Sequence, residues 1–205
     1  MPATAASPKL SERFDHALAY ASTLHRRQLR KQTDIPYIAH LISVAALVLE
    51  DGGDETEAIA ALLHDALEDQ GRGGLTRAEI REHYGEAVLA IVQSVSDTEE
   101  EPKPAWKPRK QLYIDHLTRD ASTGAVRVSL ADKLHNARAI LADYRTLGNR
   151  LWSRFSAPPS ETVWYYTSLL EVYRERCPGP MVDELGRVIE ELQRLSRTSQ
   201  SNNTA

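Results

Sequence analysis

The stretch from Ala58 to Asp69 places four ionisable side chains close together in an otherwise apolar segment. Its first six residues are all apolar, which predicts a helix that is buried on every side. The segment ends in His64, Asp65, Glu68 and Asp69. The first and third of these, and the second and fourth, are four residues apart, so each pair shares a helix face. Because an imidazole beside three carboxylates is costly to bury without a cation, we expect a divalent metal there.

Two further residues could complete a metal site with His64 and Asp65. His40 lies in the first turns of another predicted helix. Asp132 lies in the apolar stretch SLADKLHN, where a lone carboxylate is unusual unless it has a partner. Two imidazoles and two carboxylates form a mixed N/O donor set that suits Mn²⁺ or Fe²⁺, and zinc remains possible by affinity alone. A metal that prefers six ligands would keep positions for water and a substrate oxygen, as in a hydrolytic site.

Each of these residues also has an ordinary structural interpretation. A histidine on an apolar helix is usually a core residue, which would be the better explanation of His40 taken alone. Asp132 could pair with Lys133 or His135 on its own helix. The metal interpretation is favoured because a single cause then explains all four candidates together with the acids that follow them.

Composition places the chain among ordinary globular proteins. Its 205 residues are 41% hydrophobic and 26% charged, which suits one domain or a domain with small additions. The net charge of −4 gives no support for a nucleic-acid partner. The single cysteine, Cys177, fits a reducing compartment. The N-terminus lacks the apolar region of a signal peptide, and no apolar run is long enough for a membrane span. We therefore expect a cytoplasmic protein with no membrane partner.

Apolar periodicity, caps and breakers predict an all-α chain. Val126 to Leu130 could be read as a strand, but no other segment offers it a partner. The expected elements form a single irregular helical bundle over residues 8–196, with disordered tails at 1–7 and 197–205. The expected helices cover about 8–27, 36–50, 54–70, 76–84, 86–95, 109–119, 125–144, 160–176 and 180–195, with a bent connection or short helix at 145–155.

Residues 96–109 form the one long irregular stretch that the sequence predicts. Three prolines prevent a regular helix, and the charge changes from acidic to basic along it. A long polar loop inside a compact domain is more often functional than not.

Three motifs together resemble a known family of hydrolases. His40, His64-Asp65 and Asp132 are similar to the H…HD…D signature of the HD superfamily of metal-dependent phosphohydrolases. HRRQLRK (25–31) with PYIAH (36–40), ALLHDALED (61–69) and SLADKLHNAR (129–138) resemble the hydrolase domain of the RelA/SpoT family, most of all its stand-alone small alarmone hydrolases. The resemblance covers roughly residues 10–175.

The resemblance implies Mn²⁺-dependent removal of the 3′-pyrophosphate from (p)ppGpp or its adenine counterpart (p)ppApp. It implies His40, His64, Asp65 and Asp132 as metal ligands. Glu68 and Asp69 would orient or deprotonate the attacking water. The residues that it suggests for binding the nucleotide are Arg30, Lys31, Lys103, Lys107, Arg109, Lys133, Asn136 and Tyr165. No partner is implied beyond this small-molecule substrate.

The chain departs from the family pattern at positions that are not proposed ligands. Arg27, Leu41 and Gln70 stand where the family often has Gly, Pro and Thr. These departures leave the choice between guanine and adenine open. Two alternatives also stay open: another HD nucleotidase or phosphodiesterase, and a catalytically silent HD domain that senses a nucleotide.

Overall fold

Helices build the part of the chain that the structure, a computed structural model, describes: residues 10–70, 75–98 and 102–201. The predicted all-α fold is confirmed, since these residues contain no strand and only an isolated bridge between Leu29 and Pro36. None of the described helices has the length and hydropathy needed to cross a bilayer. The elements are α1 (Glu12–Leu24), α2 (Ile38–Glu50), α3 (Glu55–Leu63), α4 (Ala66–Gln70), α5 (Leu75–Val95), α6 (Trp106–Arg119), α7 (Thr123–Leu147), the 3-10 helix η1 (Gly148–Arg154), α8 (Pro159–Arg176) and α9 (Pro180–Ser201).

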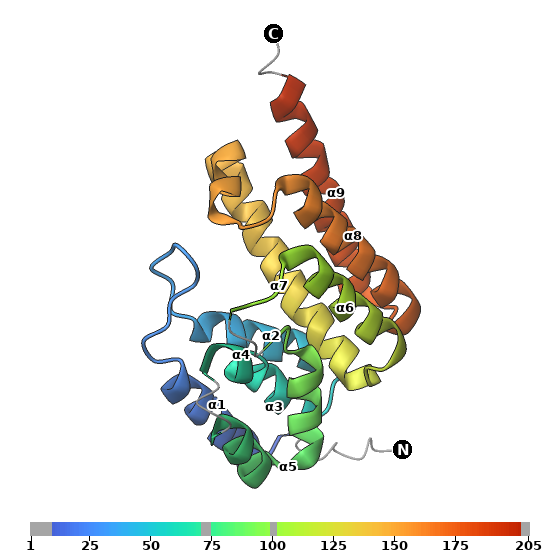
Figure 1. The fold of residues 1–205 in the computed structure, drawn as a ribbon. Helices are drawn as coiled ribbons and strands as arrows, with labels where there is room; N and C mark the ends of the chain where they lie inside the picture. Colours follow the sequence, from blue (N-terminus) through green and yellow to red (C-terminus); the bar gives the residue numbers. More distant parts are fainter. Residues whose placement is uncertain (1–9, 71–74, 99–101, 202–205) are drawn as a thin grey trace, which may run out of the picture.

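Helix α7 runs through the middle of the molecule (Figure 1). Helices α2, α3 and α5, which precede α7 in the sequence, pack against it. So do η1, α8 and α9, which follow it. The buried apolar side chains form one cluster that includes residues from all of these helices. A polar side chain on the inner part of α7 can therefore meet residues from distant parts of the sequence.

The ends of α7 have clear local causes. The Ser122 hydroxyl accepts a hydrogen bond from the backbone N–H of Ala125 at 3.2 Å and caps the first turn. Gly148 follows the last turn with φ +57°, a conformation that favours glycine. Val126 to Leu130 lie inside this helix, so the strand interpretation was rightly rejected.

Three boundaries differ from the sequence-based expectation or refine it. Gly85 has φ +83° and separates the two helical parts of α5, as predicted. Helix α6 begins at Trp106, earlier than expected, because Pro108 falls in the first turn, where no backbone N–H is needed. Helix α9 continues to Ser201 instead of ending at 195, so residues 197–201 of the expected tail lie in a helix. Residues 1–9 and 202–205 lie outside the described part.

Candidate metal centre and substrate site

Two buried histidines turn one ring nitrogen toward the same point. His40 comes from α2, and His64 directly follows α3. The Nδ1 of His64 donates a hydrogen bond to the backbone carbonyl of Ala61 at 2.8 Å, which leaves Nε2 unprotonated in the neutral ring. The Nδ1 of His40 lies 2.8 Å from the Nδ1 of His135. Burial and the nearby His40 lower the pKa of His135 to about 4. This neutral ring can therefore accept a hydrogen bond from the Nδ1–H of His40.

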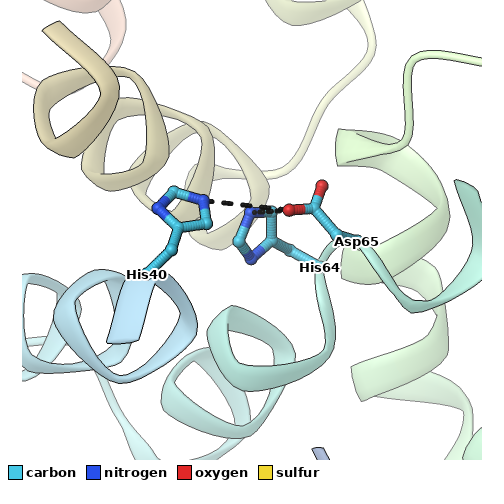
Figure 2. A group of neighbouring side chains, drawn as sticks. All are labelled: His40, His64 and Asp65. Atoms are coloured by element: carbon cyan, nitrogen blue, oxygen red, sulfur yellow. Dashed lines mark ion pairs between the residues drawn. The ribbon is translucent and has the colours of Figure 1, made fainter. Parts of the chain in front are cut away.

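Two carboxylates complete the group. The Oδ2 of Asp65 lies 3.0 Å from the Nε2 of His64 and 3.8 Å from the Nε2 of His40 (Figure 2). The Oδ1 of Asp132, from α7, lies 3.1 Å from the Nε2 of His40 and 3.7 Å from that of His64. Two nitrogen and two oxygen donors, separated by up to 92 positions in the sequence (132 − 40), therefore converge.

The donor atoms fit a divalent cation. The Nε2 atoms of His40 and His64 are fully buried and have no hydrogen-bond partner among the described residues. A buried polar atom without a partner is costly, and a metal bond would satisfy both nitrogens. The ligand atoms of His40, His64 and Asp65 lie within 4.8 Å of one another, which is close enough for one ion to bridge them.

The protonation states of these groups also favour a cation. Burial opposes ionisation of Asp65, yet the neighbouring His64 holds the pKa of this carboxyl below its usual range. Burial likewise opposes the charge on Asp132, while Lys133 and His40 hold its pKa well below normal. Burial lowers the pKa of His40, but Asp65 and Asp132 outweigh burial at His64 and raise its pKa. A proton thus competes with a metal for the same place, and metal binding would release it.

The prediction of one continuous helix through Asp69 is wrong. Helix α3 ends at Leu63, a turn contains His64 and Asp65, and α4 begins at Ala66. Consecutive residues of a regular helix point about 100° apart and do not face each other. In this structure the turn places the Nε2 of His64 and the Oδ2 of Asp65 3.0 Å apart.

Further side chains hold the carboxylates in place. The Tyr37 hydroxyl donates a short hydrogen bond to Oδ2 of Asp65. The Lys133 ammonium lies 2.5 Å from Oδ2 of Asp132, and the Asn136 amide donates to Oδ1 at 2.5 Å. Lys133 and Asn136, which the resemblance suggested for substrate binding, are thus held by Asp132 in this structure. The pairing of Lys133 with Asp132 is the structural alternative that the sequence analysis left open.

The two acids of α4 have separate partners. Lys103 donates to Oε1 of Glu68 at 2.7 Å, and the backbone N–H of Asp97 lies 3.4 Å from its Oε2. The Gln28 amide donates to Oδ2 of Asp69 at 2.6 Å. Desolvation and the charge of Asp65 raise the pKa of Asp69. Glu68 and Asp69 therefore sit one turn beyond the metal ligands, as carboxylates with fixed neighbours.

A hairpin-like segment between α1 and α2 brings one predicted nucleotide-binding residue to the site. The Arg30 guanidinium donates to Oδ1 of Asn136 at 2.7 Å and lies 5.9 Å from the centre of the Tyr37 ring. Lys31 is exposed in the same segment. Arg30 is thus linked through Asn136 to the ligand Asp132, whereas no interaction in the described part ties Lys31 to the site.

The other basic candidates spread over a wider area. Arg109 forms an ion pair with the half-buried Asp97, which also accepts a hydrogen bond from Lys110 at 2.7 Å. Lys110 lies 5.0 Å from the centre of the Tyr165 ring. Burial, together with nearby Lys133 and Arg109, lowers the pKa of Lys110 to about 7.

Lys107 and Tyr165 differ from these neighbours. Lys107 is exposed and lies 3.8 Å from Glu161 and 5.3 Å from the Trp164 ring centre. Tyr165 is buried, and its hydroxyl has no hydrogen-bond partner among the described residues. Lys107 therefore lies at the edge of the group of basic side chains that includes Arg109 and Lys110, while Tyr165 lies beneath this group.

Three residues around the site had no assigned role in the sequence analysis. Tyr37 lies in the quoted PYIAH motif, three positions before a ligand, and His135 lies three positions after Asp132. Both positions place a side chain near a ligand on a helix, so helical spacing was an available signal. Asp97 lies in the irregular stretch, where no periodicity could single it out.

A family model described as HD domain matches residues 17–157 of this chain. The chain belongs to the HD domain family. The adjacent pair His64-Asp65 of the candidate site lies within the matched residues.

Proteins named guanosine-3′,5′-bis(diphosphate) 3′-pyrophosphohydrolase MESH1 are similar to this HD domain. The one from Xenopus tropicalis is 39% identical over 125 residues, which cover 60% of this chain and 66% of that protein. The one from Homo sapiens is 38% identical over the same length and shares. The chain thus spans just under two thirds of these relatives. A solved structure titled as a metazoan ortholog of SpoT that hydrolyzes ppGpp has a TM-score of 0.74 at 24% identity, over 90% of this chain and 98% of that one, which shows the fold.

Proposed function

We propose that this HD domain is a pyrophosphohydrolase that removes the 3′-pyrophosphate from alarmone nucleotides, (p)ppGpp and/or (p)ppApp, with Mn²⁺ as its cofactor. The observation that carries the proposal is a buried N₂O₂ donor set with two further carboxylates one turn away. The names of the relatives support the same substrate class. The proposal treats residues 8–196 as one catalytic domain and places it in the cytoplasm, with no nucleic-acid partner.

His40, His64, Asp65 and Asp132 would hold the manganese. When bound, the ion would neutralise phosphate charge and make a water molecule more acidic. The mixed imidazole and carboxylate set suits Mn²⁺, and no thiolate lies among these four ligands to favour a softer metal.

The remaining residues would position the reactants. Glu68 and Asp69 would orient the attacking water and accept its proton, because carboxylates next to a phosphate-binding site can act as general bases. Lys103 is 45% exposed and could leave Glu68 to contact a phosphate oxygen of the substrate. Arg30 and Asn136 would contact the base and ribose of the nucleotide. Guanidinium and amide groups suit these polar partners.

The test measures pyrophosphate release from ppGpp and from ppApp, each with Mn²⁺ and with EDTA. We expect release that depends on manganese and that EDTA abolishes, and the ratio of the two rates gives the base preference. Release from neither substrate, with tight Mn²⁺ binding, would overturn the proposal. Turnover of nucleoside monophosphates would then favour another HD nucleotidase, and nucleotide binding without turnover would favour a silent sensor.

A further inference from the structure

The segment between α1 and α2 delivers two side chains to α4 and the turn before it. Backbone hydrogen bonds join the segment to itself, from the N–H of Arg30 to the carbonyl of Ile35 at 2.8 Å and from the N–H of Tyr37 to the carbonyl of Gln28 at 2.9 Å. Gln28 and Tyr37 are therefore neighbours. The Tyr37 hydroxyl bonds Asp65, as described above, and the Gln28 amide bonds Asp69 at 2.6 Å.

The chemistry of its partners fixes the orientation of the Gln28 amide. An ionised carboxylate only accepts hydrogen bonds, so the NH₂ group of Gln28 must face Asp69. The Oε1 atom then faces the Nδ1 of His25 at 2.7 Å, and His25 must donate to it. A reversed amide would set an oxygen against the carboxylate and an NH₂ against the imidazole N–H. In this orientation the Nδ1–H of His25 holds the Oε1 of Gln28 and so steadies the amide that serves Asp69.

His25 is itself rigidly held. It is 2% exposed, and its ring stacks on Tyr37 with 5.4 Å between ring centres and 27° between planes. Its backbone N–H caps α1 through the carbonyl of Ala21 at 3.0 Å. The adjoining turn is already closed by the backbone bond from Gln28 to the carbonyl of His25 at 2.9 Å. The side-chain bonds are therefore not needed to close the turn.

Asp69 needs such a support. It lies near the end of the five-residue helix α4, where much of the residue is exposed although its carboxylate is partly desolvated. An exposed aspartate samples several rotamers, and a catalytic carboxylate must keep one of them. The Gln28 amide is a donor that holds the Asp69 carboxylate in one orientation.

We propose that Gln28, oriented by His25, is a positioning residue that holds the Asp69 carboxylate in its working geometry. The inference rests on the proposed function through the role of Asp69. Neither residue touches the reacting atoms, and both act through Asp69. Partners of this kind typically change activity by about 10- to 100-fold when they are removed.

A double-mutant cycle on thermal unfolding tests the contact without any substrate. Gln28→Met keeps the length of the side chain and removes the amide, and Asp69→Ala removes the acceptor. We expect Gln28→Met to lower the Tm of the otherwise wild-type protein by about 2–4 °C and to lower it much less in the Asp69→Ala background. Equal losses in the two backgrounds would show that Gln28 does not act on Asp69 and would overturn the inference.

The kinetic test uses pyrophosphate release from ppGpp with saturating Mn²⁺. Gln28→Met and His25→Phe, which keeps a ring on Tyr37, should each lower kcat by about 10- to 100-fold while KM and Mn²⁺ affinity change less than about threefold. The double variant should lose no more activity than the single variant with the larger loss, because the two residues act in series. Losses that multiply, or an unchanged kcat, would contradict the inference.

The matched control is Arg26→Met, an exposed residue in the same turn. It should leave kcat and Tm unchanged. If the wild-type protein releases no pyrophosphate from ppGpp while the unfolding cycle still shows coupling, the proposed function fails and the contact between Gln28 and Asp69 stands. If the wild-type protein is active and the coupling is absent, only the inference on Gln28 fails.

Discussion

Each histidine of the metal centre uses one ring nitrogen for the fold and leaves the other for the site. The Nδ1–H of His64 donates a hydrogen bond to the carbonyl of Ala61, and the Nδ1 of His40 is paired with the Nδ1 of His135. Such partners fix the tautomer and the ring orientation of a metal-binding histidine. The site is therefore organised before a cation arrives, which reduces the cost of binding one.

Glu68→Gln tests the proton-accepting role at the residue scale. The variant should bind Mn²⁺ with unchanged affinity, because Glu68 is not among the four converging ligands. Its kcat for pyrophosphate release should fall by about 10²- to 10⁴-fold, since an amide cannot accept the proton of water. Titration calorimetry with Mn²⁺ and a pyrophosphate assay measure the two quantities. Full activity would remove Glu68 from the mechanism, and Glu86→Gln on exposed surface of α5 serves as the control.

Lys110 should give the reaction an alkaline limb. Its pKa lies at about 7 instead of the usual 10.5 because of burial and the nearby Lys133 and Arg109, so its charge is present below pH 7 and is lost as the pH rises. The resemblance to RelA/SpoT hydrolase domains also suggests Lys110, beside Arg109, as a candidate for binding the pyrophosphate of the substrate. A neutral amine holds phosphate less well, so kcat/KM should decline with an apparent pKa of about 7. Lys110→Gln should have a lower kcat/KM and lack this limb. An identical pH profile in the variant would exclude Lys110 as its source.

At the scale of elements, one arginine ties together the three segments that carry metal ligands. Arg127 of α7 lies 3.0 Å from Asp51, which caps the end of α2, and 2.6 Å from Glu57 in the first turn of α3. His40, His64 and Asp132 lie on or directly after these same helices. The ion pairs thus fix the mutual placement of the helices at a distance from the chemistry.

Removing this arginine should weaken the whole fold. Arg127 is 20% exposed, and its partners Asp51 and Glu57 are 13% and 14% exposed, so Arg127→Met leaves two poorly solvated carboxylates without a cation. We expect the free energy of unfolding to fall by about 3 kcal/mol. Urea unfolding followed by circular dichroism measures it. Arg194→Met, which breaks an exposed pair with Glu191, should change it far less, and equal effects in the two variants would contradict this prediction.

At the scale of the whole molecule, the proposed metal centre would couple metal binding to folding. The four proposed ligands come from three separate parts of the chain and meet only in the folded state. An ion that binds the folded form at 100 times its dissociation constant adds about 2.7 kcal/mol of stability. Manganese should therefore stabilise the helical bundle as a unit.

A thermal-shift experiment checks this coupling. Mn²⁺ should raise the Tm of the wild-type protein by several degrees, and EDTA should reverse the shift. Asp65→Ala should show no manganese-dependent shift and no turnover, because it loses a ligand oxygen. A shift of equal size in Asp65→Ala would place the manganese at another site.

The helical content and the set of metal-ligand candidates could be predicted from the sequence. Helices follow from apolar spacing and end residues, which are local properties, and the breaks at Gly85 and before α9 were found this way. The ligand candidates stood out because ionisable side chains such as Asp132 are rare inside apolar segments. These features depend on residue types within a few turns of one another.

Only the tertiary structure decided where the side chains meet. The turn at His64-Asp65, the bond of Arg30 to Asn136 across 106 positions, and the bond of Gln28 to Asp69 across 41 positions are invisible to local periodicity. The turn at His64-Asp65 interrupts a segment whose apolar residues predict a continuous helix, and no glycine or proline marks the break in the sequence. The partners of a buried charge are chosen by packing in three dimensions, since burial makes an unpaired group costly wherever its partner lies in the chain.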